Sequence, residues 1–440
     1  MNKILCGIKG MNDLLPSSSK LWSETEKRVK AVFEGYGYDE IRTPIVEHTD
    51  LFARGIGQVT DIVEKEMYSF VDHLNGDSLT LRPENTAAIA RAVVEHNLIY
   101  SGPKKLWYYG PMFRHERPQR GRYRQFNQFG IEAFGFDGPE IEAEQLFLIS
   151  RIWKVLGFDL LSMPRLEINC LGSRQERESY KSNLVDYFSG YFNDLDSDSK
   201  RRLKSNPLRI LDSKNPNLGD MIMESPKMSS FLGANSKLHM DGLCELLDDF
   251  GLSYKINLNM VRGLDYYNLT VFEWKHDSLG SQSTICGGGR YDGLVEMIGG
   301  KPTPAFGFAI GMERLIDIIK QQDNLETSSV LDLYVVHLGE KSKKKSIVFA
   351  EEIRNSGLQV KVDVSNSNIK TQMKRAGASG AAFVAIFGDS ELELGCVTVR
   401  PLSLDLNDNK LLQKSVPLET VAEFLLDSVK NIERNKCEKI

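Results

Sequence analysis

Two aromatic-rich segments joined by a basic loop constrain the fold of this chain most strongly. Residues 106–113 and 126–134 carry the aromatic and branched side chains that are typical of β-strands. The intervening residues lack the length and pattern of a crossover helix, so the two strands are expected to be adjacent and antiparallel. The sequence therefore predicts a sheet that is at least partly antiparallel, with a long loop at one end of this strand pair.

The loop itself has an unusual concentration of positive charge. Five arginines lie between residues 114 and 124, and Glu116 is the only acid among them. Arginine presents a planar fork of donors that suits phosphate oxygens, and crowded like charges are costly unless an anion binds there. Most charge runs are solvated surface loops, but here strands flank the run and Phe113, Tyr123 and Phe126 place aromatic faces among the arginines. We interpret the loop as a site for a phosphate-bearing ligand.

Glycine-rich phosphate loops do not account for this site. The sequence contains no GxxxxGK[ST] motif, and Gly287-Gly288-Gly289-Arg290 does not fit GxGxxG. Arg262 and Arg314 are further candidates, because glycines or aromatic residues beside each would let a ligand approach closely. Taken alone, each of the two would more often be a surface ion pair than a ligand-binding residue.

The order of helical and strand patterns predicts two domains of α/β (α+β) class. A long amphipathic helix that begins at Ser17–19 and ends near Gly35 precedes an edge strand at 41–46, and a further helix is expected near 84–96. The predicted parts are a domain over 1–325 with a mainly helical insertion at about 172–250, a polar linker at 321–329, a small α/β domain over 330–430 and a polar tail over 431–440.

Composition excludes several classes of protein. The 55 basic and 60 acidic residues give a net charge of -5, which does not favour a general binder of polyanions. The six cysteines form no CxxC pair, and a reducing, cytoplasmic location fits them best. No apolar run approaches the roughly 20 residues of a membrane helix.

Several motifs make the chain resemble the bacterial histidyl-tRNA synthetase family of class II aminoacyl-tRNA synthetases. The resemblance covers most of the length and rests on these segments: IKGMND at 8–13, VTDIVEKEMY at 59–68, LRPE at 81–84, the basic run at 113–125, RGLDYY at 262–267, GGRYDGL at 288–294 and the motif at 307–314. RGLDYY and GGRYDG carry the similarity to the histidine-specific branch. The resemblance implies an antiparallel-sheet catalytic domain and a C-terminal anticodon-binding domain.

The resemblance also implies a two-step reaction. Histidine and ATP form histidyl-adenylate, which then acylates tRNA(His), with Mg²⁺ expected on the β- and γ-phosphates. Because the substrate carboxylate is the nucleophile, catalysis reduces to positioning and charge neutralisation. The implied roles are Arg114 and Arg262 as catalytic cations at the α-phosphate, Arg114 also at the histidine carboxylate, Arg314 at the γ-phosphate, Glu116 at the adenine amino group, Phe126 on the adenine ring, and Arg122 elsewhere in the ATP site.

The same resemblance assigns a histidine pocket. Glu84, Thr86 and Gln128 would bind the amino acid at its ammonium end, Glu132 and Tyr267 would contact the imidazole nitrogens, Tyr266 and Tyr291 would shape the pocket, and Arg114 and Arg262 would adjoin it. Buried groups that hydrogen-bond both ring nitrogens reject apolar isosteres strongly. Outside the motif, Glu84 and Glu132 would each be read as surface carboxylates.

Two departures from the family pattern concern the placement of substrates. Asn127 stands where histidine is common and Asn85 where glycine is common; asparagine keeps polarity and tolerates unusual backbone angles. We expect neither to remove activity.

Further implied contacts involve tRNA and a second subunit. Arg117 and Gln119 would meet the acceptor end, and motif 1 implies a homodimer. For the anticodon, a basic helix offers Lys370, Gln372, Lys374 and Arg375, although a solvated face explains that helix equally well.

Two other functions are compatible with parts of this pattern. A regulatory paralogue resembling the synthetase-like subunit of ATP phosphoribosyltransferase would bind histidine without acylating tRNA. That subunit lacks the anticodon-binding domain and has eroded phosphate motifs, whereas this chain keeps Arg114, Arg262, Arg314 and residues 330–430. A threonyl or prolyl enzyme would have a similar ATP site but not the two histidine-type segments.

Overall fold

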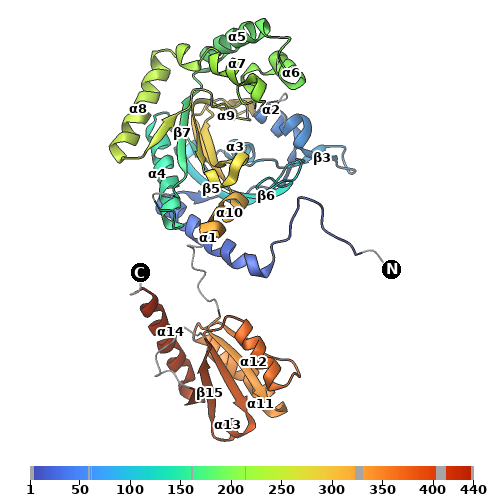
Figure 1. Ribbon diagram of the computed structural model, residues 1–440, viewed down its shortest axis with the longest axis vertical. Coiled ribbons are helices and arrows are strands. Elements are labelled where there is room, and N and C mark those ends of the chain that lie inside the picture. Colours follow the sequence, from blue (N-terminus) through green and yellow to red (C-terminus); the bar gives the residue numbers. More distant parts are fainter. Residues whose placement is uncertain are drawn as a thin grey trace. The chain divides into compact units, whose positions relative to one another are not determined.

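The computed structural model of the chain contains two compact units, residues 1–325 and 326–440 (Figure 1). It describes residues 4–57, 60, 62–159, 162–213, 215–322, 331–402 and 413–437. Val59 and Asp61 of the VTDIVEKEMY motif and residues 323–329 of the predicted linker lie outside these ranges. Within them, no helix combines the length and apolar character needed to cross a membrane.

A curved eight-stranded sheet forms the centre of the first unit. The strand order is β1-β5-β6-β11-β10-β9-β7-β8, and all neighbours are antiparallel except β1 with β5 and β7 with β8. The strands are β1 (Asp39–Glu40), β5 (Lys104–Phe113), β6 (Gln125–Phe134), β7 (Arg165–Cys170), β8 (Tyr254–Ile256), β9 (Asn268–Lys275), β10 (Thr284–Arg290) and β11 (Ala305–Gly311). The predicted antiparallel pair is confirmed as β5 and β6, and the antiparallel-dominated sheet confirms the predicted fold class.

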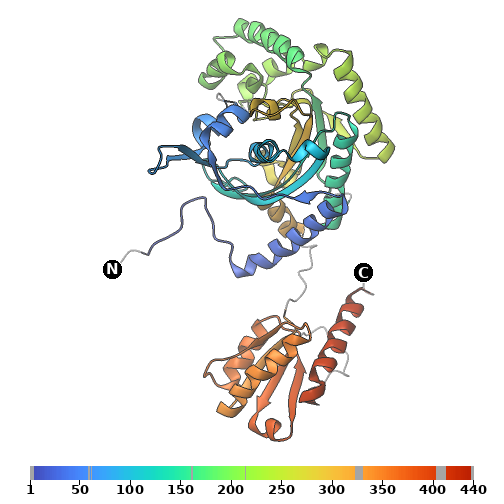
Figure 2. The same ribbon diagram turned by 180° about the vertical axis from the view of Figure 1, so that it is seen from behind.

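Helices cover both faces of this sheet. One apolar core joins the sheet to α1 (Pro16–Gly35), α4 (Glu140–Val155), α8 (Ala234–Phe250) and α10 (Met312–Gln322). A second core lies on the concave face, where Figure 2 shows a helix inside the curve of the sheet, and it contains α2 (Thr49–Ile56), α3 (Thr86–Glu95) and α9 (Leu294–Met297). The concave face is therefore only partly filled, which leaves room for a site beside α3.

Two local predictions near the N-terminus were wrong. Helix α1 begins at Pro16, before the serines at 17–19 that were expected to cap it, because Leu15 is the N-cap and Pro16 supplies the preset φ of the first helical position. Residues 41–45 are not a strand. Instead, the backbone amide of Ile41 donates to Trp107 at 2.8 Å, and the carbonyls of Thr43 and Ile45 accept from Arg82 at 3.1 and 2.9 Å.

Smaller elements complete the first unit. A three-stranded sheet contains β2 (Val46–His48), β4 (Ser78–Leu81) and β3 (Tyr68–Val71), in that order, beside a π-helix at Ile62–Glu66. Short 3₁₀-helices lie at Leu98–Ser101 and Asp277–Gln282.

A helical insert stands between β7 and β8. It contains α5 (Arg174–Gly190), α6 (Ser197–Ser205) and α7 (Gly219–Glu224) with 3₁₀ turns at Pro207–Ile210, Pro216–Leu218 and Met228–Ser230, and these elements share a separate apolar core. Helix α8, which follows them in the chain, packs in the core of the large sheet rather than in that of the insert. We use "the insert" below for residues 174–230.

The second unit is an α/β layer structure. Its strands β12 (Leu333–Leu338), β13 (Val360–Val362), β14 (Phe383–Gly388), β15 (Cys396–Pro401) and β16 (Lys414–Pro417) run in the order β13-β12-β14-β15-β16, with the first three parallel. Its helices are α11 (Glu340–Asn355), α12 (Ile369–Ala378), α13 (Asp389–Glu393) and α14 (Val421–Cys437), after a 3₁₀ turn at Leu418–Thr420. Helix α14 continues into residues 431–437, for which a polar tail was predicted.

Candidate active site

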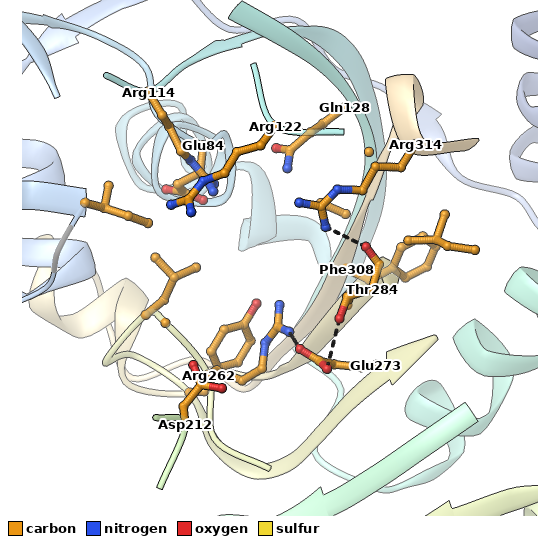
Figure 3. Close-up of a pocket in the computed structure, with 18 of the residues that line it drawn as sticks. Glu84, Arg114, Arg122, Gln128, Asp212, Arg262, Glu273, Thr284, Phe308 and Arg314 are labelled. Carbon is orange, nitrogen blue, oxygen red and sulfur yellow. Dashed lines mark hydrogen bonds and ion pairs between the residues drawn. The ribbon is translucent and has the colours of Figure 1, made fainter. Parts of the chain in front are cut away.

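A cavity of about 640 Å³ opens over strands β6, β9, β10 and β11 of the large sheet. The start of α3 and the residues that follow β5 line one side, and the segment before β9 lines another (Figure 3). This volume lies in the range of cavities that hold small ligands and cofactors.

Four arginines from separate segments converge on the cavity. Arg114 and Arg122 belong to the basic loop, Arg262 precedes β9 and Arg314 lies in α10 (Figure 3). Burial and then the nearby cations Arg114 and Arg122 lower the pKa of Arg314, and burial likewise lowers the pKa of Arg114. The arginines therefore repel one another at close range, and a polyanion in the cavity would relieve that repulsion.

Local contacts hold each of the loop arginines. The Nε of Arg114 donates to the carbonyl of Pro83 at 2.8 Å, and its guanidinium lies 5.1 Å from the centre of the Phe126 ring. Arg122 pairs with Glu116 and, at 3.3 Å, with Glu66. Glu116 and Phe126, the residues expected to bind adenine, thus line the cavity in contact with arginines.

Arg262 and Arg314 are attached to the floor of the cavity. Arg262 forms an ion pair of 2.5 Å with Glu273 on β9, whose other carboxylate oxygen accepts from the Thr284 hydroxyl at 3.1 Å. Burial alone would lower the pKa of Arg262, but the Glu273 carboxylate raises it above its ordinary value. Arg314 donates to the carbonyls of Gly121 at 2.8 Å and Thr284 at 2.6 Å. Arg262 is thus an ion-paired residue, but inside the cavity rather than on an open surface.

The glycine-rich strand β10 has a steric role in this arrangement. A Cβ on Gly287 would lie 2.7 Å from Nη1 of Arg262, and a Cβ on Gly288 would lie 2.1 Å from the carbonyl oxygen of Gly307 on β11. The glycines let Arg262 lie across the floor and let β10 and β11 approach closely.

One end of the cavity holds buried acids and tyrosines. Glu84 is 4% exposed and accepts from the backbone amides of Thr86 at 2.8 Å and Ala87 at 3.0 Å, at the start of α3. Glu132 is 1% exposed and accepts from the hydroxyls of Thr86, at 2.6 Å, and Tyr291. Burial raises the pKa of Glu84, and it raises the pKa of Glu132 to about 8. Both acids are therefore interior groups, not surface carboxylates.

The remaining predicted histidine-binding residues surround these acids. Tyr266, Tyr267 and Tyr291 form a cluster of rings whose centres are 4.7 to 6.5 Å apart. Gln128 lines the cavity, and its buried Oε1 has no hydrogen-bond partner among the described residues. Glu132 and Tyr291 stand behind the cavity lining, which includes Glu84, Thr86, Tyr266 and Tyr267.

The two asparagine departures occupy defined positions. The backbone amide of Asn127 donates to Glu313 at 2.8 Å, and its side-chain amide donates to the same carboxylate at 3.2 Å. Asn85 Oδ1 accepts from Arg82 at 3.1 Å and from the Thr43 hydroxyl at 2.7 Å. Asn85 therefore connects the start of α3 to Thr43 and Arg82, whereas Asn127 holds Glu313, which lines the cavity.

Other predicted contacts lie away from the cavity. Arg117 and Gln119 are exposed in the basic loop and are not part of the cavity lining. In the second unit, Lys370, Lys374 and Arg375 are exposed, and Arg375 pairs with Asp363 at 3.2 Å. Gln372 does not suit anticodon reading, because it is buried and its side chain bonds to both the amide and the carbonyl of His337, each at 3.0 Å.

Sequence patterns alone missed several cavity residues. Glu273 and Lys275 alternate on β9, and Glu313 immediately precedes Arg314, so sheet and helix periodicity could have placed them beside the arginines. Burial raises the pKa of Glu313 to about 7. Tyr108, Arg209 and Asp212 come from distant segments that no local pattern connects. No group of three potential metal-ligating side chains occurs in the described part of the chain.

Comparison with known proteins connects this geometry to one family. A family model described as histidyl-tRNA synthetase matches residues 10–175 and 208–315, and an anticodon binding domain model matches residues 332–428. Proteins named histidine–tRNA ligase from Burkholderia mallei and Burkholderia thailandensis are 52% identical over 430 residues, which is 97% of this chain and 96% of theirs.

Solved structures agree with this match. Apo histidyl-tRNA synthetase from S. aureus is 34% identical, with a TM-score of 0.79 over 96% of this chain and all of the other. A structure titled as an ATP phosphoribosyltransferase regulatory subunit/histidyl-tRNA synthetase from Bacillus halodurans, at 22% identity and a TM-score of 0.62 over 85% of this chain and 97% of that one, shares the fold. Since the matches span both units and the cavity motifs lie within them, the chain belongs to the histidyl-tRNA synthetase family.

Proposed function

We propose that this protein attaches L-histidine to tRNA(His) through a histidyl-adenylate intermediate. The observation that carries the proposal is the single cavity in which four arginines adjoin a buried set of acids and tyrosines. The arginine region suits a nucleoside triphosphate, and the acidic region suits a small ligand with an ammonium group and a polar ring. The 52% identical ligases of Burkholderia support the same reaction.

In the first step, a carboxylate oxygen of histidine attacks the α-phosphorus of ATP. An oxygen–phosphorus bond forms, the bond to the bridging oxygen breaks, and pyrophosphate leaves with the electron pair. Arg114 and Arg262 neutralise charge at the α-phosphate and Arg314 binds the γ-phosphate, so catalysis consists of orientation and charge stabilisation. Glu116, Phe126 and Arg122 would bind the rest of the nucleotide once their mutual contacts rearrange.

Histidine binds at the acidic end of the cavity in this proposal. Glu84, Thr86 and the unpartnered Oε1 of Gln128 receive the ammonium group, while Glu132 and Tyr267 contact the imidazole nitrogens. Tyr266 and Tyr291 enclose the ring. A ligand without ring nitrogens would leave buried polar groups unpaired, and this penalty gives the selectivity.

Mg²⁺ is proposed as part of the nucleotide substrate. Mg²⁺ characteristically binds the phosphates of nucleotides while keeping several waters. The metal ion would therefore enter bound to ATP.

In the second step, the terminal ribose hydroxyl of tRNA attacks the acyl carbonyl and loses its proton, the bond between the carbonyl carbon and the phosphate oxygen breaks, and AMP leaves with the electron pair. The exposed positions of Arg117 and Gln119 suit contact with the acceptor end. Residues 332–428, matched by the anticodon-binding model, are proposed to bind the anticodon.

A homodimer is also proposed. Phe70 and Val71 of β3 and Leu74 of the turn that leads to β4 are exposed, and an apolar surface of this kind fits a subunit interface. Sedimentation at micromolar concentration should show a dimer, and a monomer alone would refute the proposal. We further propose that the protein acts in the cytoplasm, which cell fractionation would test.

The deciding experiment is ATP–pyrophosphate exchange with each of the twenty amino acids, followed by acylation of tRNA(His). Fastest exchange with histidine and formation of histidyl-tRNA are expected. Fastest exchange with another amino acid would refute the substrate assignment. Exchange without acylation would refute the assigned transfer to tRNA.

A further inference from the structure

The segment that carries Arg262 separates two cavities. We call residues 257–267, between β8 and β9, the substrate wall. A second cavity of about 520 Å³ shares Val261, Arg262, Leu264, Tyr266 and Tyr267 with the first, so these residues face both spaces. Elements of the insert, including Arg177 and Asn206, line the second cavity on the far side of the wall.

The substrate wall has little regular structure to hold it. No helix or strand includes residues 257–267, so its backbone groups need individual partners. The large sheet supplies partners for its first part: the amide of Asn257 donates to Ile168 at 2.9 Å, and the side chain of Asn169 donates to the carbonyl of Met260 at 2.9 Å. Beyond Met260, the sheet anchors the Arg262 side chain through Glu273.

The insert contacts the wall at four places along its length. Lys227 donates to Asn259 at 2.8 Å, and Val261 packs against the apolar core of the insert. Near the end of the wall, Asn206 Nδ2 donates to Asp265 Oδ1 at 2.7 Å, and Arg177 of α5 donates to the backbone carbonyl of Tyr267. Asn206 is buried and Asp265 is exposed, so this contact joins the interior of the insert to the exposed side of the wall.

We propose that the insert positions the substrate wall for histidine activation, with Arg177 and Asn206 as positioning residues. The proposal rests on the proposed function for its kinetic consequences. Tyr267, expected to contact imidazole, is held directly by Arg177, and Asp265 lies two residues away. Arg262 has its own anchor in Glu273. The insert contacts therefore bear more on the placement of Tyr267 than on that of Arg262, and histidine binding should depend on them more than ATP binding does.

Two sets of variants of the full chain test this proposal by exchange kinetics. Arg177→Met removes the donor while keeping most of the length, and Arg177→Lys restores a cationic donor. Asn206→Asp places a carboxylate against Asp265, and combining it with Asp265→Asn restores an amide–carboxylate pair in the reverse direction. Arg174→Met, at an exposed arginine one turn earlier in α5, is the matched control.

The expected result is a large increase in the KM for histidine and a small change in the KM for ATP. Arg177→Met and Asn206→Asp should raise KM for histidine about tenfold, the effect of losing a hydrogen bond to a charged group, with KM for ATP changed less than about threefold. Arg177→Lys and the reversed pair should recover part of the loss, and the control should match the wild type. Equal changes in both KM values, or no recovery, would overturn the positioning role.

Hydrogen–deuterium exchange on the same variants tests the positioning role independently of the proposed enzymatic reaction. Peptides covering 257–267 should exchange faster in Arg177→Met and Asn206→Asp than in the control, while peptides of β5 and β6 stay protected. Unchanged protection of the wall would refute the proposal whatever the substrate. If wild-type protein failed to exchange pyrophosphate with histidine while the wall responded as expected, the proposed function would fail and the structural coupling would stand.

Discussion

Replacing Arg262 with alanine should leave the fold nearly intact, and the structure gives the reason. Glu273 loses its partner at 2.5 Å but keeps Lys275 at 3.3 Å and the Thr284 hydroxyl at 3.1 Å. The carboxylate is thus not left unpaired, and the expected loss of unfolding free energy is about 1.5–3 kcal/mol, the value of one hydrogen bond to a charged group. For a unit of this size that corresponds to a fall in Tm of roughly a few degrees.

The effect on the reaction should be far larger. Removing one fixed positive group from a site where charge develops costs about 3–4 kcal/mol in the transition state, or a hundredfold to thousandfold in rate. Histidine-dependent ATP–pyrophosphate exchange and single-turnover adenylate formation measure this directly. Arg262→Lys keeps the charge without the guanidinium fork and should retain intermediate activity.

A matched control separates the role of Arg262 from a general effect of removing an arginine. Arg165 on β7 of the same sheet pairs with Asp277 at 2.5 Å, but both side chains are exposed. Arg165→Ala should therefore leave exchange unchanged. Exchange by Arg262→Ala within threefold of wild type, with a normal Tm, would refute the assignment of this arginine to the α-phosphate.

Three further predictions concern buried polar groups and glycines. Burial raises the folded-state pKa of Glu132 to about 8, above its unfolded value near 4.5. The free energy of unfolding of the wild type should therefore fall by about 1.4 kcal/mol for each pH unit between those two values. The difference between the Tm of Glu132→Gln and the Tm of the wild type should increase from pH 5 to about pH 8 and then become constant, and a difference that does not change with pH would contradict the raised pKa. Asn127→Ala removes the 3.2 Å side-chain hydrogen bond to Glu313 but keeps the backbone hydrogen bond to the same carboxylate. The KM for ATP should therefore rise about two- to tenfold, while the KM for histidine stays unchanged. A loss of kcat greater than about tenfold would contradict this limited role. Gly288→Ala should abolish soluble expression, because its Cβ would clash with the backbone carbonyl of Gly307. Gly287→Ala should fold but lose ATP–pyrophosphate exchange, because its Cβ would displace the guanidinium of Arg262. Equal stability of the two variants would contradict this steric distinction.

Local patterns in the sequence determined a large part of this protein. The aromatic and branched side chains of two segments predicted β5 and β6, and the basic loop between them supplied two of the four arginines of the cavity, Arg114 and Arg122. Strand and helix spacing also predicted the α/β character of the second unit. These features depend on side-chain periodicity and on charge density over short stretches. Both are set by residues that lie close together in the sequence, so they can be predicted without the fold.

Near the N-terminus, contacts from distant residues decided the structure. Pro44 and its neighbours suggested a strand, but Arg82 and Trp107 provide partners for their backbone groups and keep the segment irregular. The partner that satisfies a backbone group can lie far away in sequence, and local preference is then overridden.

The tertiary structure also decided the character of the site. Glu84 and Glu132, which alone resemble surface acids, become buried because α3 packs on the concave face of the sheet. Arg262, which alone resembles a surface cation, is fixed by a carboxylate on a neighbouring strand. The sequence by itself determined which charged groups the chain carries and how densely they are spaced, whereas burial and the partners brought together by folding set their pKa values and placed them around one cavity.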